Sequence, residues 1–368
     1  MIKVAVINPY ARPDGYSGPN ILMDRLFSSL VRECSTTIVC GNPAAALNRG
    51  WAANVEVPVR LENVNSRSQL KWLLGAAWWM LRNSSKFDVV HVHGAYLFNL
   101  VSVLPCAILR RPYIIFPLGS DLSDSSRSSR LPGIQWLRRF IVSRAARGLS
   151  LAPGIDDQFR YWGLSDRRVR NIGNIAGAKF FNSSPSWAGQ RLVFVGSLSA
   201  RKRPVLILEV LAEIRQRGHN ANALFVGPFA DIETEREFER AIDQLGIDQW
   251  VTNLGYQKDV ATAIAGSTVF VLPSAKEGLP GALVEAMAMG MPAVVTGVGA
   301  MGRIVGDAQS GAIVAPTVYE IADSLSEILS SKDLWRELSQ NARSYAESHF
   351  SSAAVSKNYF RTLKEVCS

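Results

Sequence analysis

Short apolar runs alternate with longer amphipathic segments along most of the chain. Runs rich in Val, Ile and Leu predict buried strands, and the segments between them predict helices. Strands separated by helices indicate parallel βαβ units in a doubly wound α/β sheet. In the first half, the predicted strands cover 4–9, 35–41, 88–94, 113–119, 148–153 and 169–174, and a first helix covers about 19–33.

The segment 180–190, FFNSSPSWAGQ, interrupts this alternation and predicts a linker, because it is polar and contains Pro and Gly. A second α/β series follows it and ends in a helical tail over roughly 318–366. We therefore predict two α/β domains, 1–182 and 183–345, with a cleft between them, and a tail, 346–368, that packs back on the first domain. The second series has strands at 191–197, 223–228, 250–256, 269–274, 292–297 and 311–316, and helices over about 203–217 and 232–245.

The composition is that of a globular protein, since 48% of the 368 residues are hydrophobic. The first residues, MIKVAVINPY, predict a strand, and we do not expect a signal peptide there. The most apolar stretches of the chain, 73–81 and 95–109, are shorter than the roughly 20 residues that span a bilayer. Four cysteines show no Cys-x-x-Cys spacing and no metal-ligand pattern with the four histidines. We expect a cytoplasmic protein with reduced thiols, no metal and no integral membrane segment.

Positive charge is concentrated in the first half of the chain. The net charge is +9, and residues 1–182 hold 23 of the 40 Lys and Arg but 11 of the 31 Asp and Glu. An anionic partner of the first half is therefore expected, and nucleic acid, a phospholipid surface and a phosphorylated substrate all satisfy this condition.

Two carboxylates flank a glycine turn in SAKEGLPGALVEAMAMG, residues 274–290. Glu277 lies in the loop after a predicted strand, and Glu285 lies near the start of the helix that follows Pro280 and Gly281. Free amides at such a helix start favour a phosphate or a sugar hydroxyl. The alternative is plain stabilisation of the helix dipole by an acidic side chain.

A basic turn follows the first strand of the second series, in FVGSLSARKRP. Arg201 and Lys202 precede Pro204, which suits a first helical turn. Cations at a helix start oppose the helix dipole, so an anion such as a diphosphate would explain them. The alternative is a solvated basic turn.

A glycine-containing loop also follows the first strand of the chain, in NPYARPDGYSGPN. Gly15 and Gly18 allow the backbone to approach a bound group ahead of a helix. The spacing is not Gly-x-Gly-x-x-Gly, so the dinucleotide fingerprint is absent. An ordinary strand-to-helix loop is the alternative.

Taken together, these motifs resemble glycosyltransferase family 4 (group 1), whose members have the GT-B fold and transfer sugars with retention. Glu277 and Glu285 match the Glu-x7-Glu signature of this family. Other segments fall in family order over nearly the whole chain: the loop at 15–18, DVVHVHGAY (88–96), GSLSARKR (196–203), LFVGP (224–228), NLGYQKDV (253–260) and PAVVTGVGA (292–300). The resemblance implies two Rossmann-like domains that face each other across a cleft.

The resemblance also implies roles for individual residues. Glu285 would bind the ribose hydroxyls, Glu277 the donor sugar, and Lys202 the diphosphate, with Arg201 as a neighbouring cation. Gly18 would approach the diphosphate from the first domain. Backbone amides near Pro280 would donate to sugar or phosphate oxygens, from Gly278, Leu279, Gly281 and Ala282. Tyr256 and Gln257 would flank the nucleobase.

Three positions depart from the family pattern. Ser197 stands where the family commonly has Arg, Leu118 where it often has His, and Arg303 where Glu is common. No role follows for Arg303. For His91 and His93, on a predicted strand, we expect a buried position rather than catalysis.

Aromatic residues and arginines interleave in 127–148 and 71–86. Such segments suit peripheral contact with anionic lipid, and the alternative is a core-facing apolar side with solvated arginines. No nucleic-acid-binding motif accompanies the charges, so nucleic acid is not expected.

By its resemblance, the chain would be a retaining glycosyltransferase acting in cell-surface polysaccharide biosynthesis. It would move a sugar from a nucleoside diphosphate sugar, UDP- or GDP-linked, to a hydroxyl of a glycan or lipid-linked acceptor, without a cofactor or metal. Two alternatives stay open: a sugar-nucleotide epimerase of the same fold, and an inactive partner subunit. Leu118 and Ser197 keep the second alternative open.

Overall fold

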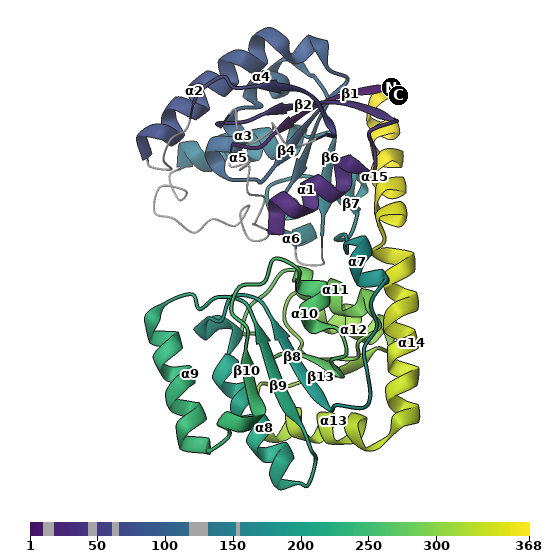
Figure 1. Ribbon diagram of the computed structural model, residues 1–368. Helices are drawn as coiled ribbons and strands as arrows, with labels where there is room; N and C mark the ends of the chain where they lie inside the picture. Colours follow the sequence, from purple (N-terminus) through teal and green to yellow (C-terminus); the bar gives the residue numbers. More distant parts are fainter. Residues whose placement is uncertain (10–17, 43–49, 61–65, 118–131, 152–154) are drawn as a thin grey trace. The chain divides into compact units, whose positions relative to one another are not determined.

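The computed structural model describes residues 1–9, 18–42, 50–60, 66–117, 132–151 and 155–368. The chain forms two compact units (Figure 1). The first comprises residues 1–175 together with 352–368, and the second comprises residues 176–351. Each unit is a parallel sheet with helices on both faces, so the predicted α/β class is confirmed.

The first unit contains a seven-stranded sheet in the order β3-β2-β1-β4-β5-β6-β7, and every strand pair is parallel. Helices α2, α3, α4 and α5 pack together on one face, and α1 and α15 pack on the other (Figure 1). The strands are β1 (Ile2–Ile7), β2 (Cys34–Val39), β3 (Ala52–Glu56), β4 (Val89–His93), β5 (Tyr113–Phe116), β6 (Arg147–Ser150) and β7 (Val169–Asn171). The helices are α1 (Gly18–Ser28), α2 (Ser66–Asn83), α3 (Leu97–Val101), α4 (Leu104–Leu109), α5 (Pro132–Arg144), α6 (Ile155–Tyr161) and α15 (Ser352–Cys367), with 3-10 turns η2 (Ser84–Lys86) and η5 (Asp166–Arg168).

The second unit contains a six-stranded parallel sheet in the order β10-β9-β8-β11-β12-β13. Helices α8, α9 and α13 cover one face, while α7, α11, α12 and α14 pack against one another on the opposite side. The strands are β8 (Arg191–Val195), β9 (Asn222–Val226), β10 (Val251–Asn253), β11 (Val269–Leu272), β12 (Ala293–Thr296) and β13 (Gly311–Val314). The helices are α7 (Ala178–Phe181), α8 (Pro204–Gln216), α9 (Ile232–Leu245), α10 (Val260–Ile264), α11 (Gly281–Ala288), α12 (Met301–Ala308), α13 (Val318–Ser330) and α14 (Lys332–His349), with 3-10 turns η6 (Ala200–Lys202) and η7 (Asp248–Trp250).

The strand order reverses direction between β1 and β4 in the first sheet, and between β8 and β11 in the second. In open parallel sheets, ligands bind beyond the carboxyl ends of the strands beside such a reversal. The central strands β4, β11 and β12 are buried along their whole length, so the loops that follow them begin from well-packed positions. The loops after β8 and β11 are therefore the expected place for a site in the second unit.

One strand was not predicted from the pattern. Strand β3 lies at the edge of the first sheet, and most of its residues are exposed. An edge strand has one neighbour only, so its sequence, AANVE, need not carry a continuous apolar run.

The helical tail divides between the two units. Helix α14 packs on α11 and α12, whereas α15 packs on α1 and β4 of the first unit. The observed units change at residues 175/176 and 351/352, whereas the predicted domain boundaries were 182/183 and 345/346.

Hydrogen bonds and ion pairs hold α15 to the first unit. The Tyr359 hydroxyl lies 2.8 Å from Nδ1 of His91, and the Ser356 hydroxyl bonds that of Ser29. Glu365 accepts 3.2 Å hydrogen bonds from both Arg147 and Arg170. The end of the chain is thus an integral part of the first unit.

The lipid-facing surface expected over 127–148 needs correction. Arg138 is only 1% exposed, and its guanidinium lies 5.1 Å from the centre of the Trp162 ring. Ile141 is also fully buried, although Trp136 is 66% exposed. The sequence could not separate these positions, because the side of α5 that faces the sheet depends on the packing. Arg127 and Arg130 lie outside the described residues.

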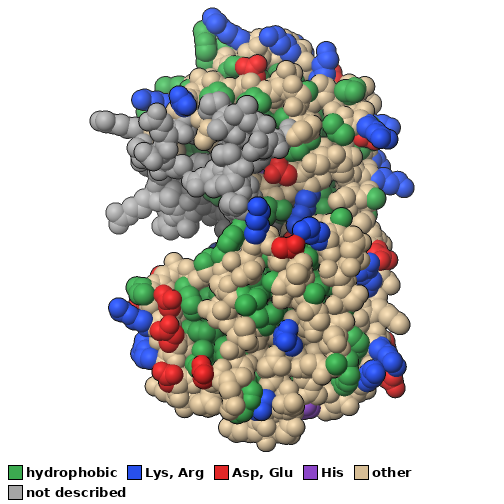
Figure 2. All heavy atoms as spheres, viewed as in Figure 1, with side chains coloured by type: hydrophobic (Ala, Val, Ile, Leu, Met, Phe, Trp, Pro, Cys, Tyr) green, Lys and Arg blue, Asp and Glu red, His purple; other side chains and the backbone are tan. Residues whose placement is uncertain are grey.

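Figure 2 shows acidic side chains gathered over α9, in the second unit. This helix carries Glu233, Glu235, Glu237, Glu239 and Asp243, which accounts for much of the acidic balance of residues 183–368. In the described part of the chain, no helix combines the length and the apolar character needed to cross a membrane.

Candidate functional site

The carboxyl ends of β8 and β11 bring the basic turn and the Glu277 loop together. Lys202 ends η6, six residues after Gly196, and Glu277 lies in the loop 273–280 between β11 and α11. The amide of Ala275 donates to the Arg201 carbonyl at 2.8 Å, which joins the two loops directly. Two loops that are far apart in the sequence therefore lie side by side at the carboxyl ends of β8 and β11.

Lys202 lies directly above Gly196. A Cβ at Gly196 would fall 2.2 Å from Nζ of Lys202, and the backbone there has φ +140°. The positive φ favours glycine, and a side chain here would in addition displace the Lys202 ammonium. Glycine at this position thus leaves room for the Lys202 ammonium at the end of β8.

Glu277 is held by cations and a hydroxyl. Its Oε1 lies 2.8 Å from Nη1 of Arg201 and 3.9 Å from Nζ of Lys202, and it accepts a 3.3 Å hydrogen bond from Ser274. The side chains of Glu277 and Lys202 are only 11% and 12% exposed, whereas that of Arg201 is 48% exposed. Two cations and one carboxylate leave an excess of positive charge at this point.

Burial lowers the pKa of Lys202. The neighbouring Arg201 lowers it further, and the Glu277 carboxylate opposes both effects. A bound anion would favour the charged form of the lysine in the same way as Glu277 does. The local charge therefore suits a ligand that brings negative charge to Lys202.

The Glu277 loop is fixed from the neighbouring strand ends. Arg203 donates to the Pro273 carbonyl at 3.2 Å, and Thr296 donates to the Ser274 carbonyl at 2.6 Å. On the far side, the Ala300 amide donates to the Gly278 carbonyl at 2.9 Å. A Cβ at Gly299, where φ is +59°, would lie 2.2 Å from the Glu277 carbonyl oxygen. Gly299 therefore permits a contact that brings the loop after β12 onto the Glu277 loop.

The start of α11 offers backbone donors. Among the described residues, no hydrogen-bond acceptor is paired with the amides of the four residues around Pro280, which are Gly278, Leu279, Gly281 and Ala282. The helix has no side-chain cap and no acidic residue in its first turn. Unpaired amides at a helix start, with the dipole behind them, attract an anion or a hydroxyl oxygen.

Glu285 lies in helix α11, whereas Glu277 lies in the loop before it. It lies just over one turn into α11, and its side chain is half-buried. The predicted role at the ribose stays a prediction, as do those of the other site residues.

Tyr256 and Gln257 follow β10, at the same edge of the sheet. Tyr256 is 54% exposed, and the Gln257 side-chain amide donates to the Leu254 carbonyl at 2.8 Å. An exposed ring beside the strand ends is compatible with the predicted place next to a nucleobase.

The remaining predicted positions are more scattered. Gly18 begins α1 in the first unit. Ser197 is exposed after β8, and Arg303 on α12 pairs with Asp307 of its own helix at 3.3 Å. Leu118 and Gly15 lie outside the described residues. His91 and His93 are buried, as expected, at 0% and 2% exposure.

Sequence reasoning missed the supporting residues Gly196, Ser274, Thr296 and Gly299. A glycine directly after an apolar strand was a usable signal for Gly196. The contacts of the other three residues link separate loops, so no local pattern indicates them.

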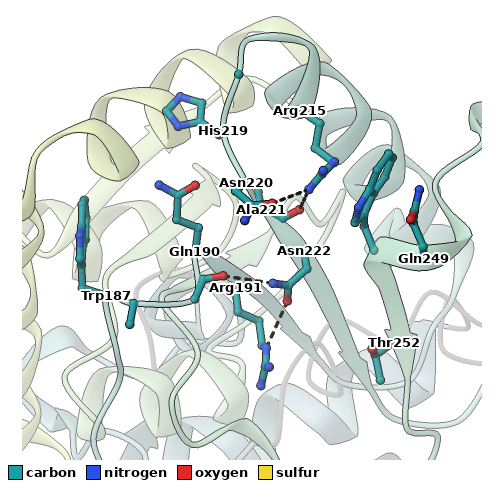
Figure 3. A pocket seen from close by; sticks show the side chains of 14 residues that line it. Trp187, Gln190, Arg191, Arg215, His219, Asn220, Ala221, Asn222, Gln249 and Thr252 are labelled. Atoms are coloured by element: carbon teal, nitrogen blue, oxygen red, sulfur yellow. Dashed lines mark hydrogen bonds between the residues drawn. The ribbon is translucent and has the colours of Figure 1, made fainter.

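A polar pocket of about 780 Å³ lies at the opposite end of the same sheet (Figure 3). It is lined at the starts of β8 and β9 by Arg191 and Asn222, whose side chains are joined by a 3.2 Å hydrogen bond. Its position at the amino ends of the strands separates it from the Glu277 loop.

Family models match most of the chain. The model described as "Glycosyl transferases group 1" matches residues 181–345, and that described as "Glycosyl transferase 4-like domain" matches residues 17–174. The first match falls within the second unit, and the second match falls within the first unit.

Individual proteins show the same relationship. The chain is 24% identical to the alpha-D-kanosaminyltransferase of Streptomyces kanamyceticus, over 80% of this chain and 83% of that protein. It is 22% identical to the alpha-maltose-1-phosphate synthase of Mycolicibacterium smegmatis, over 99% and 100% respectively. Its fold matches that of HepE from Anabaena, solved in complex with UDP and glucose, with a TM-score of 0.77, 18% identity, and coverage of 99% and 100%. The chain is thus a GT-B glycosyltransferase that uses a nucleotide sugar, and it belongs to glycosyltransferase family 4 (group 1).

Proposed function

We propose that this glycosyltransferase moves a hexose from a UDP- or GDP-sugar to a hydroxyl of a glycan or lipid-linked acceptor, with retention at the anomeric carbon. The observation that carries the proposal is the Lys202 ammonium, held above Gly196 and 3.9 Å from the Glu277 carboxylate at the carboxyl edge of the second sheet. An anion beside Lys202 and a sugar beside Glu277 would then lie next to each other.

Lys202 and Arg201 bind the diphosphate in this proposal. The bond between the anomeric carbon and the phosphate oxygen breaks, so negative charge grows on the departing diphosphate. A buried ammonium stabilises that charge more in the transition state than in the ground state. Glu277 accepts hydrogen bonds from hydroxyls of the donor sugar, and its contact with Arg201 fixes its orientation.

Glu285 accepts hydrogen bonds from the ribose hydroxyls. Backbone amides of the four residues around Pro280, namely Gly278, Leu279, Gly281 and Ala282, donate to sugar or phosphate oxygens. Tyr256 and Gln257 flank the nucleobase.

The acceptor hydroxyl attacks the anomeric carbon from the face that the diphosphate leaves. Its proton passes to a phosphate oxygen of the leaving group, which balances charge without a protein nucleophile. This front-face course explains retention, and it is the course that the family resemblance implies.

A donor screen tests the proposal. Turnover of UDP- and GDP-sugars is measured with a panel of glycan and lipid-linked acceptors, and NMR of the product gives the anomeric configuration. Turnover with retention that is lost in Glu277→Gln and Lys202→Ala supports the proposal. An inverted product contradicts the retaining mechanism, and an epimerised nucleotide sugar formed from donor alone favours an epimerase. Folded chain that turns over no donor favours the partner subunit.

No metal is needed in this proposal, because Lys202 and Arg201 supply the positive charge. Within the described residues, no group of three or more His, Cys, Asp or Glu is placed to hold a metal ion. Turnover should persist in a chelator. Loss of turnover that Mg²⁺ restores would contradict this part of the proposal.

We further propose that the first unit contacts an anionic membrane from the cytoplasmic face, during synthesis of a cell-surface polysaccharide. Four large apolar side chains on one side of α2, here called the α2 stripe, are 49–62% exposed: Leu70, Leu74, Trp78 and Leu81. The Arg82 guanidinium lies 4.3 Å from the centre of the Trp78 ring. Exposed apolar residues with flanking cations suit an interfacial helix.

A further inference from the structure

A second basic site lies in the first unit, at the amino ends of β5 and β6. It is a pocket of about 420 Å³, on the opposite edge of this sheet from the strand ends where ligands are expected. Among the described residues, four arginines from three segments line it, and they are called the four-arginine pocket: Arg110, Arg111, Arg144 and Arg168. Of the described residues that line the pocket, none is Asp or Glu.

Separate elements bring these arginines together. Arg110 and Arg111 directly follow α4, Arg144 is the last residue of α5, and Arg168 ends η5. The pocket floor includes Tyr113, at the start of β5. Four arginines in one pocket repel each other, so their convergence carries an energetic penalty in the absence of negative charge.

Nearby carboxylates are paired with other arginines. Asp166 lies 3.1 Å from Arg160, and Glu365 lies 3.2 Å from both Arg147 and Arg170. In the part of the chain that the structure describes, none of the four pocket arginines forms an ion pair. Their charge is therefore left for a ligand.

Two of the guanidiniums are held in place. That of Arg144 lies 3.9 Å from the centre of the Phe140 ring, and Nη1 of Arg168 donates to the Ala145 carbonyl at 3.2 Å. Both arginines also oppose the rise that burial causes in the pKa of Tyr113. Arg111 acts in the same direction on Cys106, another lining residue, whose pKa burial raises to about 12. Arg111, Arg144 and Arg168 are thus close enough to influence the ionisable side chains that line this pocket.

We propose that the four-arginine pocket binds a phosphate or diphosphate group. Planar guanidiniums from several directions suit a tetrahedral, multiply charged anion, to which each donates one or two charge-assisted hydrogen bonds. Ile108 and Leu109, in the last turn of α4, are 62% and 49% exposed beside Arg110. The phosphate belongs either to a lipid, whose chain would contact these two residues, or to a compound free in solution.

Calorimetry with inorganic pyrophosphate tests whether the pocket binds a phosphate group, whichever compound carries it. The full chain carries Arg201→Ala with Lys202→Ala in every sample, which removes both cations at the Glu277 loop and so weakens pyrophosphate binding there. Arg144→Ala with Arg168→Ala should reduce pyrophosphate affinity by at least about tenfold, the equivalent of one good charge-assisted hydrogen bond. The matched control is Arg160→Ala, which removes a paired arginine of the same unit. Arg110→Gln with Arg111→Gln, at two exposed positions, is a second variant if the first one folds poorly.

Vesicle sedimentation separates the two sources. Phosphatidic acid in phosphatidylcholine vesicles is compared with phosphatidylcholine alone, and Leu74→Ser with Trp78→Ser controls for the α2 stripe. Arginine-dependent binding to phosphatidic acid vesicles identifies a lipid phosphate, and arginine-dependent binding of pyrophosphate alone identifies a soluble one. If both probes bind the arginine variants as they bind the Arg160→Ala control, or if neither probe binds, the proposal is wrong.

Discussion

At Gly196 the absence of a side chain leaves room for the Lys202 ammonium at the end of β8. The ammonium occupies the space where a Cβ would be, and Glu277 and Arg201 complete its surroundings. The pKa of Lys202 is lowered mainly by burial, which disfavours the charged ammonium. A bound ligand of negative charge would stabilise that ammonium. Lys202 is proposed to act on the charge of the diphosphate, whereas Glu285 is proposed to form hydrogen bonds with the ribose. The two residues should therefore affect kcat and nucleotide affinity differently when they are replaced.

Replacing Lys202 with Ala should lower kcat by roughly 100-fold, because the ammonium acts on charge that develops as the diphosphate departs. The KM for the donor should change much less. Steady-state kinetics over donor concentration measure both values. A variant that raises KM and leaves kcat intact would place Lys202 in ground-state binding only.

Replacing Glu285 with Ala should weaken nucleotide binding by about 1–3 kcal/mol, roughly 5- to 150-fold in Kd, because paired hydrogen bonds to the ribose are lost. Isothermal calorimetry with the nucleoside diphosphate measures this change. Glu239→Ala on α9, away from the loop, is the control. Unchanged affinity in Glu285→Ala would remove Glu285 from the ribose.

At the scale of elements, neighbouring loops hold the Glu277 loop through backbone contacts. The loop after β8 accepts the Ala275 amide, and the loop after β12 donates the Ala300 amide to Gly278. Gly299 makes the second contact possible, because its Cα lies against the Glu277 carbonyl. The position of a site residue thus depends on a glycine more than twenty positions away in the sequence.

Gly299→Ala should displace the Glu277 loop and raise the donor KM several-fold, with a loss of about 1–3 kcal/mol in the free energy of unfolding. The control is Gly189→Ala, where a Cβ meets nothing within 4 Å. Kinetics and urea unfolding are measured on both variants. Equal behaviour of the two variants would show that the contact at Gly299 does not position the loop.

The α2 stripe gives a second prediction at this scale. Trp78→Ser with Leu74→Ser should reduce sedimentation with anionic vesicles by more than about fivefold, because each lost side chain removes roughly 1.5–3 kcal/mol of apolar burial. Turnover of a soluble acceptor should be unchanged. Vesicle binding equal to that of the original chain would place the membrane contact elsewhere.

At the scale of the whole molecule, the last helix completes the first unit. Tyr359 of α15 is fully buried, and its hydroxyl lies 2.8 Å from His91 on β4. Burial lowers the pKa of His91 well below its usual value, and His93 beside it lowers that pKa further. The imidazole is therefore neutral in the folded chain.

This buried histidine predicts acid sensitivity. As the pH falls below about 6.5, the unfolded chain binds a proton at His91 that the folded chain does not, so stability is lost as the pH falls. The slope from this one group is at most about 1.4 kcal/mol per pH unit. Urea unfolding at about pH 7.5 and about pH 5 measures the difference.

His91→Phe with Tyr359→Phe should flatten that dependence, because both polar partners are removed together. His349→Gln, at an exposed position, is the control. An unchanged pH slope in the double variant would assign the acid sensitivity to other groups.

The sequence by itself determined the fold class, the family and the order of the motifs. Buried parallel strands require continuous apolar runs, and these runs are visible without coordinates. The glycosyltransferase assignment and the GT-B fold predicted in this way are confirmed by the family models and by the fold comparison. Edge strand β3 was missed, because an exposed edge carries no such run.

Only the tertiary structure decided which side chains meet. Lys202 lies above Gly196, Arg201 pairs with Glu277, Arg138 is buried against Trp162, and α15 returns to the first unit. The four-arginine pocket likewise joins arginines from three segments of the first unit. Local sequence patterns are set by the burial of each element, whereas these contacts depend on strand order and helix packing, which bring together residues far apart in the chain.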